Sequence, residues 1–403
     1  MGNIAPWSSL LKESFDGSIG VRGAKAYVRR GRELLLERHR SGARGHELVS
    51  AYSDMMDCLL RHLFEGASSD YIQRYPSLDR RCALIAQGGY GRKELNPHSD
   101  IDLLFLHVWK VTPYVESVAE KILYTLWDTG LQVGHAIRSM VETVRLSNKD
   151  PIVKTALVDA RYLCGDREIF DEFQKGLQED FLRGNRDRFV RRKVEEFRSR
   201  HDRYGGSVYL LEPDIKEGEG GLRDIHTALW IAKAKLKVGE LGDLIPSGLM
   251  SPKDLEKLND SLDFLLRVRN ELHFGAGKHQ DQLSFEEQER TAQALGFKDE
   301  EGLRGVEVFM RSYYLHAAEI SRVASLAIHR MTGASEFSRP GSQPAGREIR
   351  EGVRVSKWGL RITQPSILAS NPENLMTIFA EAQRHRVDID HDTRELIREY
   401  LGF

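Results

Sequence analysis

The sequence lacks a continuous apolar run of about 18 residues, the length that a membrane-spanning helix requires. We therefore expect no membrane partner. Cysteine is also scarce, with three residues in 403: Cys58, Cys82 and Cys164. An odd and scattered set forms neither a disulfide framework nor a zinc-binding pattern, and it fits a reducing compartment. Together these features predict a cytoplasmic location.

An excess of charge of one sign is lacking as well. Lysine and arginine number 59 against 60 aspartates and glutamates, which gives a formal net charge of −1. This balance argues against a globally basic nucleic-acid binder, so no nucleic-acid partner is expected. Hydrophobic residues make up 40% of the chain and charged residues 30%, a composition typical of a globular protein and not of a disordered one.

The length of the chain suggests about two or three domains, and the apolar pattern indicates where they lie. Helical spacing dominates at first, strands and helices alternate next, and the pattern then turns almost wholly helical. We predict an α+β protein with these parts in chain order: an N-terminal helical segment over 1–67, a small α/β core over 68–165, a helical domain over 166–334, a linker rich in Ser, Pro and Gly over 335–349, and a C-terminal segment over 350–403.

The most specific pattern follows the apolar run 81–87, which predicts a buried strand. The run ends in Gly88 and Gly89, a pair that lets backbone N–H groups approach an anion closely. A helical turn follows and adds a favourable dipole. The chain then re-enters the sheet as Asp-Ile-Asp, in which Asp100 and Asp102, at positions i and i+2, face the same way. Two carboxylates at that spacing can bind Mg²⁺.

The glycines alone are weak evidence, because Gly-Gly-Tyr-Gly-Arg fits neither the dinucleotide-binding fingerprint nor a P-loop. The combination is more specific: a strand, Gly-Gly, a twelve-residue step from Gly88 to Asp100, a serine before the first aspartate, and Asp-x-Asp inside an apolar strand. An acidic strand end with a glycine turn is the ordinary structural alternative. It is disfavoured because two acids flanked by Ile, Leu, Leu and Phe would then be desolvated without a partner.

This combination resembles the signature of the DNA polymerase β-like nucleotidyltransferase superfamily. The full string GGYGRKELNPHSDIDLLFL is similar to the transferase domain of the bacterial PII protein uridylyltransferases, a family of enzymes of nitrogen regulation. Three later stretches agree with that family: Leu126 to Arg138, Glu212 to Asp224, and Arg267 to Leu283. The resemblance implies a mixed-sheet nucleotidyltransferase core with N-terminal helices and a C-terminal helical domain.

The resemblance also implies roles for individual residues. Gly88 and Gly89 are expected to bind the triphosphate of a nucleotide, with Ser99 close by. Asp100 and Asp102 are expected to be the catalytic pair that binds Mg²⁺. Five further residues are candidates for contacts to phosphate or nucleotide: Arg92, His135, Arg138, Lys216 and Arg223. A structural hydrogen bond is the alternative for Arg92 and His135.

The superfamily often has a third carboxylate on a later strand, but residues 131–138 offer Gln132 instead of an acid. Asp159 is our candidate for this third metal ligand, and an ion pair with a neighbouring arginine is the alternative. The glycine-rich segment 212–224 is either a solvated loop or an ordered loop that closes on nucleotide or on a protein substrate. The basic segment 186–204 is expected to be a helix with a solvated face.

The resemblance predicts transfer of UMP from UTP to a tyrosine of the PII signalling protein, with Mg²⁺ as the cofactor and pyrophosphate as the product released. Two alternatives stay open. One is a nucleotidyltransferase with another acceptor or nucleotide, and the other is a non-catalytic module that binds PII and regulates it. The resembled enzyme also has a metal-dependent phosphohydrolase domain and two ligand-sensing domains, and we expect the chain to end before them.

Overall fold

The computed structural model describes residues 7–15, 20–75, 81–180, 186–337, 346–356, 359–370 and 373–401. Its first part forms three helices, α1 (Trp7–Ser14), α2 (Val21–Arg40) and α3 (Gly45–Arg74). Strands and helices then alternate: β1 (Cys82–Ala86), α4 (Gly88–Gly91), β2 (Ile101–His107), α5 (Pro113–Asp128), β3 (Val133–Ser139), α6 (Met140–Lys149), α7 (Pro151–Val158), β4 (Arg161–Gly165) and α8 (Arg167–Asp180).

The remaining elements are mainly helical. They comprise α9 (Arg186–Arg203), α10 (Leu222–Leu236), the short 3-10 helix η2 (Leu241–Leu244), α11 (Pro252–Ala276), α12 (Phe285–Ala294) and α13 (Gly305–Phe337). A small unit follows, with β5 (Arg347–Arg350), β6 (Val353–Ser356), β7 (Gly359–Ile362), α14 (Ser366–Ser370), α15 (Glu373–His385) and α16 (His391–Leu401). The centre of the predicted linker, 338–345, lies outside the described residues. Within the described ranges, no helix is long and apolar enough to cross a membrane.

The central sheet has the strand order β3-β2-β1-β4. β1 runs antiparallel to β2 and to β4, whereas β2 and β3 run parallel, so the sheet is mixed. The helix α5 supplies the crossover between the two parallel strands, and its start is fixed by Pro113 and by the Thr112 side chain, which accepts a hydrogen bond from the N–H of Val115. The predicted α+β fold class, with a mixed sheet and added helices, is confirmed.

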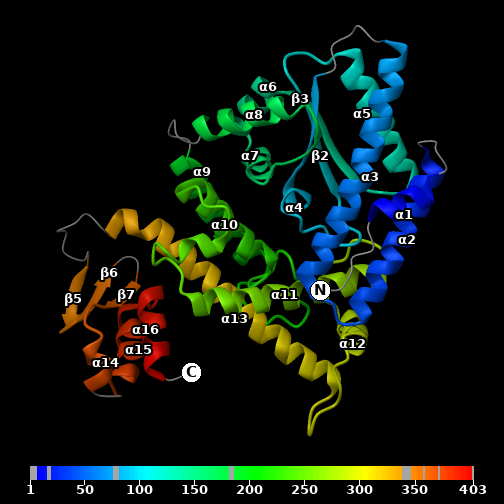
Figure 1. The fold of residues 1–403 in the computed structure, drawn as a ribbon. Coiled ribbons are helices and arrows are strands. Elements are labelled where there is room, and N and C mark those ends of the chain that lie inside the picture. The colour runs from blue at the N-terminus through cyan, green and yellow to red at the C-terminus, as the bar shows by residue number, and fades with distance from the viewer. Residues whose placement is uncertain are drawn as a thin grey trace.

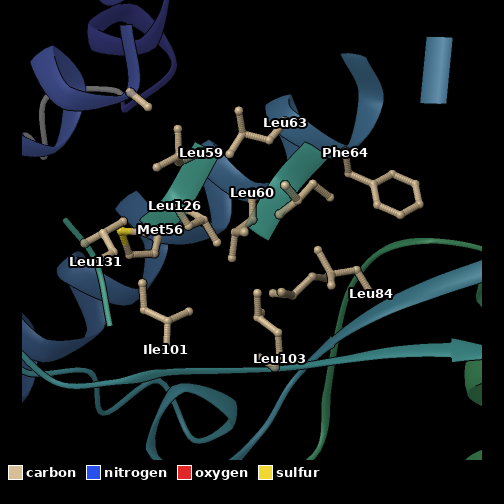
Figure 2. Close-up of a cluster of buried hydrophobic side chains, with 14 of the residues drawn as sticks. Met56, Leu59, Leu60, Leu63, Phe64, Leu84, Ile101, Leu103, Leu126 and Leu131 are labelled. Atoms are coloured by element: carbon tan, nitrogen blue, oxygen red, sulfur yellow. The ribbon is translucent and has the colours of Figure 1, made fainter. Parts of the chain in front are cut away.

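The alternation of side chains along β2 builds two cores on opposite faces of the sheet. Ile101, Leu103 and Phe105 pack with residues of α3 and α5. Figure 2 shows part of this cluster, where Ile101 and Leu103 lie opposite side chains of α3 such as Leu60. Leu104 and Leu106 point to the other face, where they pack with apolar residues of α8. Both faces are buried, which is why the strand reads as an almost continuous apolar run.

The helical domain forms a core of its own, in which α10, α11 and α13 pack together. α11 also packs against α3, and α10 contacts α7, so the domain adjoins the sheet core at two places. In Figure 1, α4 at the end of β1 lies on the side of the sheet that faces α10 and α11. The turn between β1 and β2 therefore faces the helical domain.

Candidate active site

The carboxylate of Asp102 fills a small space beside the turn between β1 and β2. Gly88 has a left-handed backbone conformation, with φ of +56°, and begins α4, which a single residue separates from the end of β1. A Cβ atom at Gly88 would lie 3.1 Å from Oδ2 of Asp102, and a Cβ atom at Gly134 on β3 would collide with Oδ1. The two glycines therefore make the room that the Asp102 carboxylate fills.

The predicted pair of acids lies at the start of β2. Asp102 is half-buried and pairs in register with Gly134, whereas Asp100 is exposed. Burial and the neighbouring negative charge of Asp100 raise the pKa of Asp102 to about 6, and the ammonium of Lys216 partly opposes this shift. The two carboxylates repel each other when both are ionised. A bound cation would relieve that repulsion, and carboxylate oxygens are the ligands that Mg²⁺ prefers.

A cavity of about 420 Å³ joins this pair to the helical domain. Most of the predicted site residues line it: Gly88, Gly89, Arg92, Ser99, Asp100, Asp102, Asp159, Lys216 and Arg223. Residues of α9, α10 and α11 complete the lining, among them Lys193, His226, Trp230 and Arg269. The fold thus gathers around one space the motifs that the sequence spreads over about half of the chain.

The hydroxyl of Ser99 is buried in this lining. Its Oγ makes no hydrogen bond to any residue within the described ranges. The backbone N–H of Ser99 donates to the carbonyl of Asn96 across 3.0 Å, which closes a turn directly before Asp100. A buried hydroxyl without a partner is unfavourable. A polar ligand that enters the cavity can satisfy it, as expected of the predicted triphosphate site.

Two predicted nucleotide contacts, His135 and Arg138, lie on β3 outside the lining of the cavity. His135 pairs in register with Leu103, and its ring packs against α5. Because Leu103 belongs to the core under α3 and α5, His135 faces the side of the sheet opposite to Asp102. Arg138 pairs with Leu106, well along the strand. Their contact with nucleotide stays a prediction that this placement does not favour.

Arg92 belongs to a buried polar network that also contains Asp159. Its Nη1 donates to Asp159 across 2.6 Å and its Nε to Glu94 across 2.7 Å. The Asp159 carboxylate also accepts hydrogen bonds from Nε1 of Trp230 at 2.7 Å and Nζ of Lys233 at 2.8 Å. Burial would raise the pKa of Asp159, but the charges of Arg92 and Lys233 hold it below its ordinary value. Asp159 is an ion-pair partner here, and metal binding by it stays a prediction.

Sequence reasoning missed three residues of α10 that reach this network: His226, Trp230 and Lys233. They follow one another at i, i+4 and i+7, which places them on one helix face, and this spacing was the available signal. Nε2 of His226 lies 2.8 Å from Oε2 of Glu94. Burial and the nearby Arg92 charge lower the pKa of His226 to about 4, so its ring is neutral at pH 7.

The glycine-rich segment before α10 is ordered. Two backbone hydrogen bonds of 2.9 Å join residues 213–215 to residues 281–283. The Lys216 ammonium lies 4.0 Å from Oδ2 of Asp281, and burial lowers the pKa of Lys216. The guanidinium of Arg223 donates to a carboxylate of the same segment across 2.7 Å. The solvated-loop alternative does not describe these residues, and both cations line the cavity.

The predicted solvated face of the basic helix over 186–204 is wrong at two positions of α9. Lys193 is 2% exposed, and its Nζ lies 4.9 Å from the ring of Trp230. Arg200 is also buried and donates to Asp224 across 2.5 Å. Both residues are buried because α9 packs against α10, where Lys193 meets Trp230 and Arg200 meets Asp224. Charge alone could not reveal this contact between helices.

Comparison of the sequence with known proteins identifies a matching family model and curated relatives. Residues 188–328 match the family model described as GlnD PII-uridylyltransferase, a span that runs from α9 into α13. The matched span includes the cavity residues Lys193, Lys216 and Arg223, whereas Asp100 and Asp102 precede it.

Similarity to curated proteins extends beyond the span that matches the family model. The chain is 35% identical over 377 residues to the bifunctional uridylyltransferase/uridylyl-removing enzyme of Nitrobacter winogradskyi. This alignment covers 91% of this chain and 40% of that protein. It is 35% identical over 382 residues to the protein of that name from Bradyrhizobium sp. strain BTAi1, covering 92% and 40%. Against the Cereibacter sphaeroides protein of that name, identity is 38% over 312 residues, covering 77% and 34%. The chain spans about two fifths of the length of the first two relatives.

Proposed function

We propose that the chain is a Mg²⁺-dependent nucleotidyltransferase of nitrogen regulation, which transfers UMP from UTP to a tyrosine of the PII protein and releases pyrophosphate in the cytoplasm. The observation that carries the proposal is the pair Asp100 and Asp102, held beside Gly88 and Gly89 at the cavity. The match to the GlnD PII-uridylyltransferase family and the names of the curated relatives support the choice of nucleotide and acceptor.

The residues at the cavity fit Mg²⁺. Asp100 and Asp102 supply hard carboxylate oxygens, and burial together with the Asp100 charge raises the pKa of Asp102. Gly88 and Gly134 hold the Asp102 carboxylate in a space that a Cβ atom at Gly134 would fill. When bound, Mg²⁺ supplies charge that lowers the proton affinity of the attacking hydroxyl and stabilises the leaving pyrophosphate.

The chain's own residues would bind and orient the reactants. The backbone around Gly88 and Gly89 and the Ser99 hydroxyl would hold the triphosphate of UTP, with the cations Lys216 and Arg223 facing its negative charge. The phenol oxygen of the acceptor tyrosine would lie close to the aspartate pair, whose carboxylates favour loss of its proton.

In the reaction, the tyrosine oxygen forms a bond to the α-phosphorus of UTP. The bond from the α-phosphorus to the bridging oxygen of the pyrophosphate breaks in line with it. The electron pair of the broken bond leaves with pyrophosphate, and the phenol proton passes to an aspartate carboxylate or to water. The cavity residues therefore act by positioning and by electrostatics, with no covalent enzyme intermediate.

The decisive experiment incubates the chain with Mg²⁺, α-labelled UTP and a PII protein and examines the PII protein by mass spectrometry. We expect a mass gain of one UMP on a tyrosine, and parallel reactions with ATP, CTP and GTP test the nucleotide. Asp100→Asn and Asp102→Asn should abolish the transfer while the fold is retained. Asp260→Asn, at an exposed acid on α11, is the matched control and should keep full activity.

The outcomes separate the alternatives. Transfer of another nucleotide, or transfer to another acceptor only, would replace UTP or PII in the proposal and keep the nucleotidyltransferase chemistry. Binding of PII without transfer and without binding of UTP and Mg²⁺ would support the regulatory module. A folded Asp100→Asn, Asp102→Asn double variant with full activity would remove the catalytic assignment altogether.

A further inference from the structure

The proposed function gives no role to a buried polar chain on the helical side of the cavity. Arg269 on α11 donates from Nε to Oδ1 of Asp281 across 2.7 Å and from Nη2 to Oδ2 across 3.1 Å. Both side chains are buried, with 8% and 7% of their surface exposed. This two-pronged pairing fixes the plane of the guanidinium.

The third nitrogen of Arg269 reaches the sheet core. Nη1 donates a hydrogen bond to Oδ1 of Asn96, in the loop between α4 and β2. Nδ2 of Asn96 in turn donates to Oδ1 of Asn270 across 2.7 Å. Both asparagines are fully buried. The helical domain therefore holds the loop through the side chain of Asn96. The amide oxygen of Asn96 accepts from Arg269, and its amide nitrogen donates to Asn270.

Asn96 is close in the chain to the catalytic pair. Its carbonyl accepts the N–H of Ser99, and this turn leads directly into Asp100. Asp100 precedes the first residue of β2, so the sheet ladder does not hold it as it holds Asp102. The position of the Asp100 carboxylate depends on the turn, and the turn depends on Asn96.

We propose that Asp281 and Arg269 are positioning residues for nucleotidyl transfer, which hold the turn from Asn96 to Asp100 and so fix the Asp100 carboxylate beside Asp102. This inference rests on the proposed function of the cavity. Neither residue need touch the reacting atoms. The Asp281 carboxylate also lies 4.0 Å from the Lys216 ammonium, which would face the triphosphate. Asp281 therefore contacts both this cation and Arg269, which holds the loop before Asp100.

A metal site is the competing explanation for this region. The donor atoms of His273, His279 and Asp281 lie within 4.8 Å of one another. However, both oxygens of Asp281 already accept hydrogen bonds from the Arg269 cation, which would repel a metal ion. Nδ1 of His273 is buried and has no partner within the described ranges, whereas a metal-bound histidine normally donates its second ring N–H to an acceptor. These contacts favour the positioning role of Asp281 and Arg269 over a metal site.

The test compares Arg269→Lys and Asn96→Ala with wild type. Lysine keeps the charge of residue 269 but cannot make the paired bonds to Asp281 and the bond to Asn96 together. Asn96→Ala removes the hydrogen bond between Arg269 and Asn96 and leaves the ion pair of Arg269 with Asp281 intact. This variant tests the proposal if Arg269→Lys does not fold. Arg322→Lys is the matched control, because Arg322 on α13 is half-buried and pairs with three carboxylates, away from the cavity lining.

Two readouts are measured at a temperature at which every variant is folded. We expect kcat for UMP transfer to fall about tenfold or more in Arg269→Lys and Asn96→Ala, with KM for UTP within about threefold of wild type, because misplacement of a catalytic group affects the chemical step. Mn²⁺ binding to the Asp100–Asp102 pair should weaken in both variants. The control should lose stability but keep kcat and Mn²⁺ affinity.

Equal kcat and equal Mn²⁺ affinity in wild type and both variants would overturn the positioning role. Stoichiometric Zn²⁺ or Mn²⁺ binding that His273→Ala removes would overturn it in favour of the metal site. Inactive wild-type protein would remove the proposed function instead, and the Mn²⁺ titrations of the same variants would still decide whether Arg269 and Asn96 fix the aspartate pair.

Discussion

Arg92 donates a hydrogen bond of 2.6 Å to Asp159, which joins the turn after α4 to the C-terminal end of α7. The two side chains have 8% and 0% of their surface exposed. Lys233 and Trp230 of α10 bind the same carboxylate, so one acid holds three elements together. Arg92 is thus a fixed part of the cavity wall, and a bound phosphate would share it with carboxylates that already hold it.

Asp159→Asn should destabilise the protein strongly. The change leaves the Arg92 charge and the half-buried Lys233 charge without their shared counter-charge. Removing one partner of a buried ion pair costs about 3–5 kcal/mol. Urea unfolding at pH 7 measures the free energy of unfolding. Asp187→Asn, at an exposed acid on α9, should change it by less than about 0.5 kcal/mol. Equal stability of Asp159→Asn and wild type would show that Asp159 does not hold these elements together.

The part of the site that depends on local sequence could be predicted. The strand before Gly88 and the strand that carries Asp102 follow from apolar runs, and the shared direction of Asp100 and Asp102 follows from the two-residue period of a strand. The mixed sheet came from the family resemblance. These features need only a few neighbouring residues, so one sequence carries enough information to find them.

The part that depends on distant contacts could not be predicted. His135 was expected near nucleotide, but the register of β3 against β2 turns it to the other face, and register is set by the whole sheet. His226 and Lys193 were not expected in the cavity, because their burial follows from how α9 and α10 approach the core. The ion pair of Asp159 was foreseen only as an alternative to metal binding, since spacing along the chain cannot distinguish the two.

Buried neutral histidines should make the fold sensitive to mild acid. Burial, with the nearby charge of Arg92, lowers the pKa of His226 to about 4, and burial lowers that of His273 to about 4, from an ordinary value of 6.5. A lowered folded-state pKa means that stability is complete above pH 6.5 and is lost as the pH falls towards 4. Each histidine should account for roughly 3 kcal/mol over this window.

Unfolding curves between pH 7 and pH 4 check this expectation. His226→Gln removes one titrating group, so its stability should fall less steeply with acid than that of wild type. His46→Gln, at an exposed histidine, should follow the wild-type curve. Parallel curves for wild type and His226→Gln would contradict the neutral, buried state of His226.

Lys216→Met should weaken binding of UTP. Lys216 is half-buried in the cavity lining, and its ammonium lies 4.0 Å from the carboxylate of Asp281, so it is available to a phosphate. A hydrogen bond to a charged group contributes about 1.5–3 kcal/mol, which corresponds to a loss of affinity of about tenfold or more. Calorimetric titration with UTP and Mg²⁺ measures it. Lys257→Met, at an exposed position of α11, is the control; unchanged affinity in Lys216→Met would exclude a phosphate contact.

Asp102→Asn should inactivate the site and yet stabilise the protein without metal. Burial and the Asp100 charge raise the pKa of Asp102 to about 6 from an ordinary 3.8, so ionised Asp102 is less favourable in the folded state than in the unfolded state. The contribution of the carboxyl group is fully favourable below pH 3.8 and is lost as the pH rises through 6. Asparagine does not titrate, so the variant should be more stable than wild type by about 1–3 kcal/mol at pH 8, with the difference vanishing near pH 4.

Mg²⁺ should reduce this difference in stability. An ion that binds the folded state alone stabilises it by mass action, so millimolar Mg²⁺ should raise the unfolding temperature of wild type at pH 8 and leave that of Asp102→Asn unchanged. Asp260→Asn should respond to Mg²⁺ as wild type does, because it keeps the aspartate pair. If Asp102→Asn were less stable than wild type at pH 8 without metal, the carboxylate would be held by favourable contacts and not by the requirement for a cation. The stability cost of Asp102 would then no longer argue for metal binding at this pair.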